Sequence, residues 1–160
     1  MTFRVGQGFD AHPLAPGRTL VLGGVEVPFD RGLEGHSDGD VVVHALMDAL
    51  LGAAALGDKG THFPSSDPAL EGVSSLKLLE KVGLLLSERG WRVGNLDATI
   101  LAQRPSLGPF VGQMQQNIAA ALRTDSSKVS LKTTTTDRLG FTGREEGMAA
   151  YAVALIETQE

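Results

Sequence analysis

Carboxylates and histidines gather near the start of this chain. All four histidines fall within the first 62 residues, and residues 1–60 hold eight acids against four bases. Asp10 and His12 are two positions apart, so in an extended segment their side chains point to the same side. Together with His44 they would supply one carboxylate and two imidazoles. Three such ligands with a fourth position left open are typical of catalytic zinc sites.

The spacing alone leaves other interpretations open. An Asp-x-His triplet can be an ordinary turn, a helical histidine can be a packed side chain, and the same ligand set also occurs at non-haem iron sites. His44 is expected on a helix, where Asp40 and Asp48 lie four residues to either side and share its face. Either acid could orient the imidazole.

A first segment that could contact phosphate is Gly35–Asp40, which leads into the helix that carries His44. The start of a helix has free N–H groups and a partial positive charge, so anions bind there. His36 and Ser37 could then donate hydrogen bonds to a phosphate. A plain capping turn is the alternative interpretation.

A second such segment is Lys132–Asp137, with four consecutive threonines before its carboxylate. Hydroxyls beside an acid suit a phosphate and its magnesium, because magnesium prefers oxygen ligands. An exposed strand is the alternative, since threonine favours strands. Arg144 follows in a glycine-rich loop and could bind an oxyanion through two hydrogen bonds. Asp58-Lys59-Gly60 and Phe63-Pro64 could contact substrate or simply form turns, and we expect His62 to be structural.

The elements that must position these residues follow from hydrophobic periodicity and turn signals. Gly23-Gly24, between two short apolar runs, predicts a tight hairpin. The remaining pattern predicts strands at 2–9, 91–101, 128–134 and 148–156, helices at 40–55, 74–89 and 109–123, and loops at 62–68 and 137–147. We therefore expect one α/β (α+β) domain over residues 1–160, with a mixed, mainly four-stranded sheet, three helices packed on one face and a small β-hairpin.

The amino-acid composition argues against several classes of protein. The net charge of −5 argues against a nucleic-acid partner, because such binding depends on cations that neutralise phosphates. The absence of cysteine excludes disulfides, thiol nucleophiles and iron–sulfur clusters. No secretory signal is visible, and the longest strongly apolar stretch without charge, residues 49–57, is far shorter than the roughly 20 residues that span a membrane. We expect a soluble cytoplasmic protein without a membrane partner.

The motifs occur together, and in one order, in a single known family. They are Gly8–His12, Gly35–Asp40 with His44–Leu50, Gly57–Asp58 through His62–Pro64, Ala102–Pro105 and Thr134–Gly147. From Thr2 to Ile156 the chain resembles the 2-C-methyl-D-erythritol 2,4-cyclodiphosphate synthases of isoprenoid (terpenoid) biosynthesis.

The resemblance implies a phosphorus–oxygen lyase of the methylerythritol phosphate pathway. Its substrate would be 4-diphosphocytidyl-2-C-methyl-D-erythritol 2-phosphate. The 2-phosphate would attack the β-phosphate, giving 2-C-methyl-D-erythritol 2,4-cyclodiphosphate and CMP. The resemblance also implies a homotrimer whose sheets face the central axis and whose active sites lie between subunits.

The resemblance further implies a role for each motif residue. Asp10, His12 and His44 would hold one Zn²⁺ per subunit, and Asp137 would hold Mg²⁺ or Mn²⁺ bridging the substrate diphosphate. His36 and Thr135 would be the catalytic residues that stabilise the transition state. The residues expected to contact substrate are Asp10, His12, His36, Ser37, Asp58, Gly60, Phe63, Asp67, Ala102, Pro105, Ser106, Thr134, Thr135, Thr136, Asp137, Phe141 and Arg144.

Three positions depart from the family pattern. Asp137 stands where the family usually has Glu, Ser106 where it usually has Lys, and Ser65 where an Asp commonly follows Phe-Pro. Two alternative functions remain at this point. One is a metal-dependent phosphohydrolase or oxygenase with the same Asp/His/His site. The other is a non-catalytic trimer that binds an isoprenoid diphosphate in a central channel lined by Phe9 and Arg144.

Overall fold

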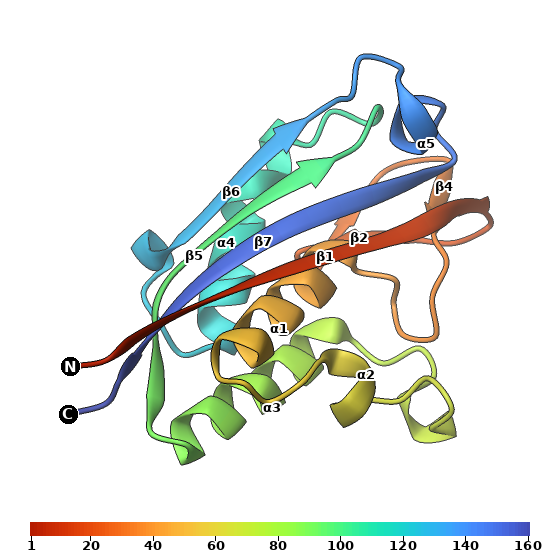
Figure 1. Ribbon diagram of the computed structural model, residues 1–160. Coiled ribbons are helices and arrows are strands. Elements are labelled where there is room, and N and C mark those ends of the chain that lie inside the picture. Colours follow the sequence, from red (N-terminus) through yellow and green to blue (C-terminus); the bar gives the residue numbers. More distant parts are fainter.

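A computed structural model describes all 160 residues, and it has two layers, a twisted sheet and a layer of helices against one of its faces (Figure 1). The five-stranded sheet has the order β4-β1-β7-β5-β6, and β2 and β3 form a separate hairpin. The strands are β1 (Phe3–Pro16), β2 (Leu20–Leu22), β3 (Val25–Val27), β4 (Arg31–Leu33), β5 (Trp91–Leu101), β6 (Val129–Thr134) and β7 (Gly147–Thr158). The α-helices are α1 (Val41–Ala53), α2 (Lys59–His62), α3 (Ser75–Glu88), α4 (Val111–Ala121) and α5 (Gly140–Gly143).

The sheet is mixed, as expected, because β5 and β6 are parallel while the other pairings are antiparallel. The small hairpin is confirmed, and Gly23 and Gly24 have φ angles of 55° and 73°, which glycine adopts at little cost. No helix is long and apolar enough to cross a membrane.

The structure corrects the expected fold in three respects. A fifth strand, β4, joins the sheet because residues 31–33 pair with the far end of β1. That first strand ends at Pro16 rather than Phe9, so Asp10 and His12 lie inside it. Two single-turn helices, α2 and α5, lie within segments that lacked a helical pattern; four residues are too few to show a period.

Helix α1 is the structural centre of the site because it packs directly on the strand that carries Asp10 and His12. A Cβ added at Gly6 would lie 2.0 Å from the carbonyl oxygen of Ala49, and one at Gly8 would lie 2.0 Å from that of Ala45. The absence of side chains at these glycines therefore sets how closely α1 approaches β1.

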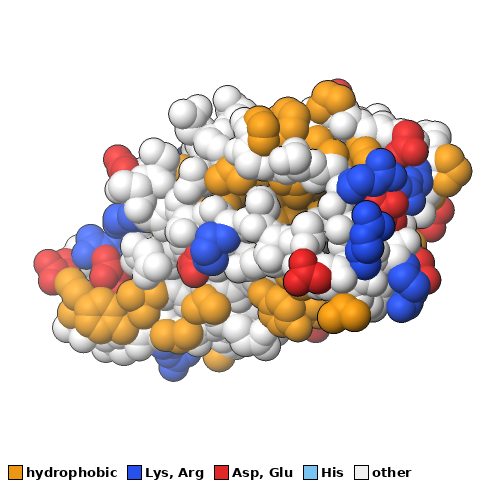
Figure 2. Space-filling view, turned by 90° about the horizontal axis from the view of Figure 1, so that it is seen from above, with side chains coloured by type: hydrophobic (Ala, Val, Ile, Leu, Met, Phe, Trp, Pro, Cys, Tyr) orange, Lys and Arg blue, Asp and Glu red, His pale blue; other side chains and the backbone are white.

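The other face of the sheet is uncovered and apolar. Along β1 and β7 alternate residues point to opposite faces, and those on the uncovered side include Phe3, Val5, Phe9, Tyr151 and Val153, all exposed. Figure 2 looks onto this face and shows hydrophobic side chains exposed on it, some within a hollow. A surface of this kind indicates an interaction site.

Candidate active site

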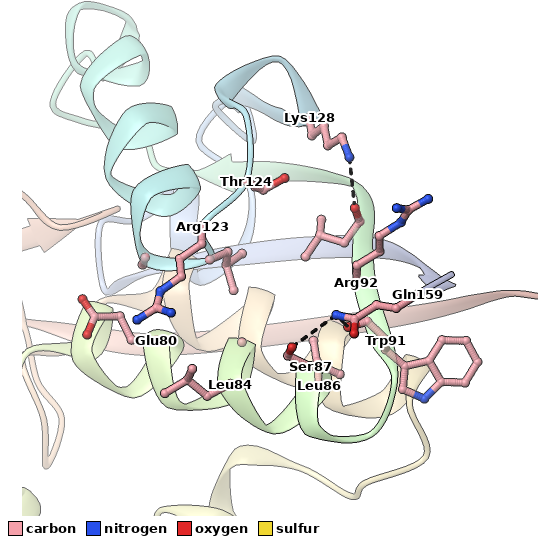
Figure 3. Close-up of a pocket in the computed structure, with 14 residues that line it drawn as sticks. Glu80, Leu84, Leu86, Ser87, Trp91, Arg92, Arg123, Thr124, Lys128 and Gln159 are labelled. Carbon is pink, nitrogen blue, oxygen red and sulfur yellow. Dashed lines mark hydrogen bonds between the residues drawn. The ribbon is translucent and has the colours of Figure 1, made fainter.

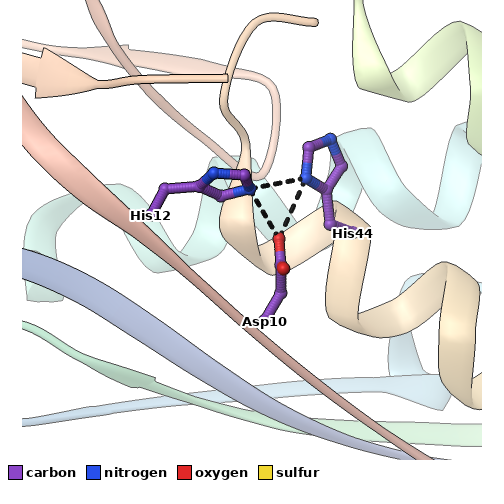
Figure 4. A group of neighbouring side chains, drawn as sticks. All are labelled: Asp10, His12 and His44. Atoms are coloured by element: carbon purple, nitrogen blue, oxygen red, sulfur yellow. Dashed lines mark hydrogen bonds and ion pairs between the residues drawn. The ribbon is translucent and has the colours of Figure 1, made fainter. Parts of the chain in front are cut away.

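Asp10, His12 and His44 meet between β1 and α1 (Figure 4). Asp10 Oδ2 lies 2.7 Å from His12 Nε2 and 3.0 Å from His44 Nδ1, and these two nitrogens are 3.1 Å apart. Three ligand atoms from two distant parts of the sequence thus point at one another.

This arrangement fits a divalent metal ion. A tetrahedral ion that binds its ligands at about 2.0–2.1 Å keeps neighbouring ligand atoms roughly 3.3 Å apart. The three separations, 2.7–3.1 Å, are shorter than that value, so the side chains would have to move apart by a few tenths of an ångström to admit the ion. The site is also partly enclosed, since the His44 side chain is 8% exposed and that of Asp10 is 14% exposed.

The charge state of Asp10 suits a metal ligand. Its burial opposes ionisation, but hydrogen bonds from His12 and His44, helped by the charges of His12 and Lys59, hold the pKa of Asp10 well below its usual range. Asp10 is therefore a carboxylate at neutral pH.

The prediction that Asp40 or Asp48 orients the imidazole of His44 is wrong. Asp40 lies at the start of α1, where its carboxylate accepts hydrogen bonds from the backbone N–H groups of Gly23, Gly24 and Val43. Asp40 therefore connects the β2–β3 hairpin to α1, of which it is the N-cap residue. The carboxylate of Asp48 is paired with Lys59 at 3.1 Å. Neither acid contacts the imidazole of His44.

A cavity of about 260 Å³ opens beside the triad. Of the residues expected to contact substrate, it is lined by His12, His36, Ser37, Gly60 and Phe63. Asp58 caps α2 by accepting from the backbone N–H of Thr61, and its own pKa is lowered by this bond and by the Thr61 hydroxyl.

Lys59 also lines this cavity, and its Nζ lies 3.6 Å from Asp10 Oδ1. It belongs to the Asp58–Gly60 segment that the sequence predicted as a substrate contact, although no role of its own was predicted for it. His36 Nε2 lies 2.8 Å from the carbonyl oxygen of Asp67, while the Asp67 carboxylate accepts from Ala69 N–H. Asp67 thus fixes the loop that holds His36. His62 Nε2 lies 2.7 Å from the backbone carbonyl oxygen of Leu56, in keeping with a structural role.

A second group of predicted residues gathers where β5 and β6 end. Ala102 N–H donates to the carbonyl of Thr134, which brings the segment of Ala102, Pro105 and Ser106 beside Thr134, Thr135 and Thr136. Asp137 and Phe141 line a neighbouring hollow of about 530 Å³ together with Phe9 and Tyr151. Arg144, nearby in sequence, forms an ion pair with Glu146.

The two groups lie on opposite faces of the sheet. Asp10 belongs to the triad on the helix side, while its neighbour Phe9 lines the hollow of Asp137 on the uncovered side. Adjacent residues of a strand point to opposite faces. In addition, β7 and β5 separate β1 from β6, which corresponds to about 14 Å. One subunit therefore does not bring its two groups together.

A further cleft of about 290 Å³ lies between α3, α4 and β5 (Figure 3). Two of its three cations are already engaged: Arg92 pairs with Glu157, and Lys128 donates to the carbonyl of Val93. None of the predicted site residues lines it. The triad cavity is therefore the better candidate for the active site.

The fold and the triad together define an α+β domain with an Asp/His/His group that fits a divalent metal ion. The YgbB family profile matches residues 3–157, and the chain belongs to this family. A protein of Symbiobacterium thermophilum named 2-C-methyl-D-erythritol 2,4-cyclodiphosphate synthase is 60% identical over 152 residues, which cover 95% of this chain and 97% of that protein.

Solved structures agree with this assignment. The bifunctional IspDF of Campylobacter jejuni superposes with a TM-score of 0.96 at 40% identity, and the match covers 99% of this chain but 43% of that larger one. The CDP complex of Plasmodium falciparum IspF gives a TM-score of 0.87 at 31% identity and covers 99% of this chain and 97% of that one.

Proposed function

We propose that the protein converts 4-diphosphocytidyl-2-C-methyl-D-erythritol 2-phosphate to 2-C-methyl-D-erythritol 2,4-cyclodiphosphate and CMP in isoprenoid biosynthesis. The observation that carries this proposal is the convergent Asp10–His12–His44 triad in a chain 60% identical to a synthase of that name. The reaction makes the enzyme a phosphorus–oxygen lyase. Its cytoplasmic location stays a prediction from the sequence.

The chemistry requires little beyond positioning and charge stabilisation. The 2-phosphate is already an anion at neutral pH, so its oxygen attacks the β-phosphorus without a strong general base. The bond from that phosphorus to the oxygen of CMP breaks, and CMP leaves with the electron pair. Both reacting groups belong to one molecule, so holding it in a folded conformation supplies much of the rate.

In this proposal Asp10, His12 and His44 would hold Zn²⁺, which would supply Lewis-acid polarisation of a phosphoryl oxygen. His36 and Ser37 donate to the phosphates, and Gly60 and Phe63 contact the methylerythritol. Asp137 would hold Mg²⁺ or Mn²⁺, and Thr135 would stabilise the transition state. Ala102, Pro105, Ser106, Thr134 and Thr136 surround the cytidine.

We propose a homotrimer because the two groups of site residues lie on opposite faces of one sheet. A neighbouring copy can bring its Asp137 group to the triad of the first. The apolar uncovered face, with exposed Tyr151 and Val153, would be buried in this assembly. A central channel near Phe9 could bind an isoprenoid diphosphate as a separate ligand.

The decisive assay measures products with Zn²⁺ and Mg²⁺ present. CMP and a cyclic diphosphate are expected, and inorganic phosphate would instead favour the phosphohydrolase alternative. His44→Ala should abolish turnover while leaving any isoprenoid diphosphate binding intact. Full turnover by His44→Ala would contradict the metal assignment.

Mixing inactive variants tests the shared site. His44→Ala and Asp137→Ala should each be inactive alone. After co-refolding, random trimers would contain both intact groups in about a quarter of their sites, so activity should return. No recovery from trimers shown to be mixed would argue against a site between subunits.

A further inference from the structure

The far side of the His44 ring contacts two serine hydroxyls, and one of them, that of Ser75, lies outside the predicted site. His44 Nδ1 faces Asp10 and His12, and the other ring nitrogen, Nε2, lies 2.9 Å from Ser75 Oγ at the start of α3. Ser75 is completely buried, and His44 is 6% exposed. Ser75 Oγ is in turn 2.5 Å from Asp38 Oδ1.

The direction of these hydrogen bonds follows from the chemistry of the groups. A carboxylate only accepts, so the Ser75 hydroxyl donates to Asp38. The Ser75 oxygen is then free to accept, and the group beside it is His44 Nε2. A ring that donates from Nε2–H has its lone pair at Nδ1 when neutral. The lone pair therefore points at the centre of the triad.

Asp38 is itself firmly held. Its Oδ2 accepts from the backbone N–H of Ser75 at 2.9 Å, and its Oδ1 accepts from that of Asp40 at 3.1 Å. The Ser37 hydroxyl also lies 3.0 Å from His44 Nε2, but it contacts no carboxylate that would fix the direction of its own hydrogen. Ser75 thus differs from Ser37 in being polarised by a fixed charge.

We infer that Ser75, oriented by Asp38, is a positioning residue that fixes the tautomer and orientation of His44 for metal binding. This inference rests on the proposed metal site. It adds Ser75 and Asp38 as the residues that orient His44, the most buried of the three ligands. Outer partners of metal-bound histidines commonly change metal affinity by about 10–100-fold. The same loss is expected here when the Ser75 hydroxyl is removed.

The test compares Ser75→Ala with Ser74→Ala. Ser74 is the neighbouring residue and makes no side-chain capping hydrogen bond, so it is a matched control. Zinc affinity would be measured by chelator competition, and the ring tautomer of His44 by ¹⁵N NMR of the metal-free protein. Ser75→Ala should bind zinc about 10–100-fold more weakly and show mixed tautomers, whereas Ser74→Ala should match wild type.

A second variant, Asp38→Asn, keeps the shape of the side chain and removes the fixed acceptor charge. It should also weaken zinc binding and lose the single Nε2–H tautomer. Wild-type affinity and a single tautomer in both Ser75→Ala and Asp38→Asn would overturn the inference. If wild type itself binds no zinc, or His44→Ala binds it equally well, the proposed metal site fails instead.

Discussion

Replacing Gly8 with alanine should disturb the metal site through packing alone. Gly8 lies two residues before Asp10 in β1, and the added methyl group would lie 2.0 Å from the carbonyl oxygen of Ala45 in α1. Ordinary contacts of a Cβ atom are 3.4–4 Å. Helix α1, which carries His44, must therefore move away from β1, which carries Asp10 and His12.

The size of the effect follows from that displacement. Relief of the contact requires a shift of about 1 Å or more, and overpacking of this kind costs about 1–3 kcal/mol. For a chain of this length the melting temperature should fall by about 2–12 °C. Ligand distances at metal sites tolerate only about 0.2 Å. Zinc affinity should therefore fall at least about tenfold, which is 1.4 kcal/mol.

The assay combines thermal unfolding in a chelator with zinc titration of the folded protein. Gly112→Ala is the control, because Gly112 is exposed in α4 and an added Cβ there meets nothing within 4 Å. The free energy of unfolding of Gly112→Ala should rise by about 0.5–1 kcal/mol, and its zinc affinity should equal that of wild type. A Gly8→Ala protein that is destabilised but keeps wild-type zinc affinity would refute the link between packing and ligand geometry.

Three further predictions concern charge and metals. Burial, with the charge of Asp38, raises the pKa of Asp40 to about 6, so the native state binds this proton more tightly than the unfolded state does. The stability that this proton contributes is lost as pH rises from about 4 through 6. Over this range urea unfolding should show the free energy of unfolding of wild type falling by up to about 3 kcal/mol relative to that of Asp40→Asn. A constant difference between the two proteins would contradict this prediction. Asp137→Glu, one methylene longer, should lower the Mg²⁺ concentration that gives half-maximal activity, and an unchanged requirement would mean that Asp137 does not contact the ion. Added Zn²⁺ should raise the melting temperature of wild type but not of His44→Ala, and an equal rise in both would place the ion elsewhere.

Much of the site could be predicted from local sequence. The Asp-x-His spacing places two ligands on one side of a strand, and the Gly23-Gly24 pair determines a hairpin because few other residues adopt its backbone angles. The buried face of α1 follows from its apolar residues. The ordered motifs identify the family, which the profile over residues 3–157 confirms.

Other features were decided only by the tertiary structure. Ser75 is 31 residues from His44, and no local pattern indicates which hydroxyl will reach the imidazole. The four-residue helical spacing predicted Asp40 and Asp48 as partners of His44, and this prediction was wrong. The carboxylate of Asp40 binds the hairpin backbone instead, and that of Asp48 pairs with Lys59.

There is a physical reason why some of these features follow from the sequence and others only from the tertiary structure. Sequence determined which ligand types this chain has and which local elements carry them, because periodicity and turn geometry act over a few residues. Strand pairing decided that Phe9 lines the hollow on the uncovered face of the sheet while Asp10 lies in the triad on the helix side. Helix packing, made close by the glycines of β1, decided that His44 of α1 lies beside that strand. Those contacts join distant segments, so their geometry appears only when the whole chain has folded.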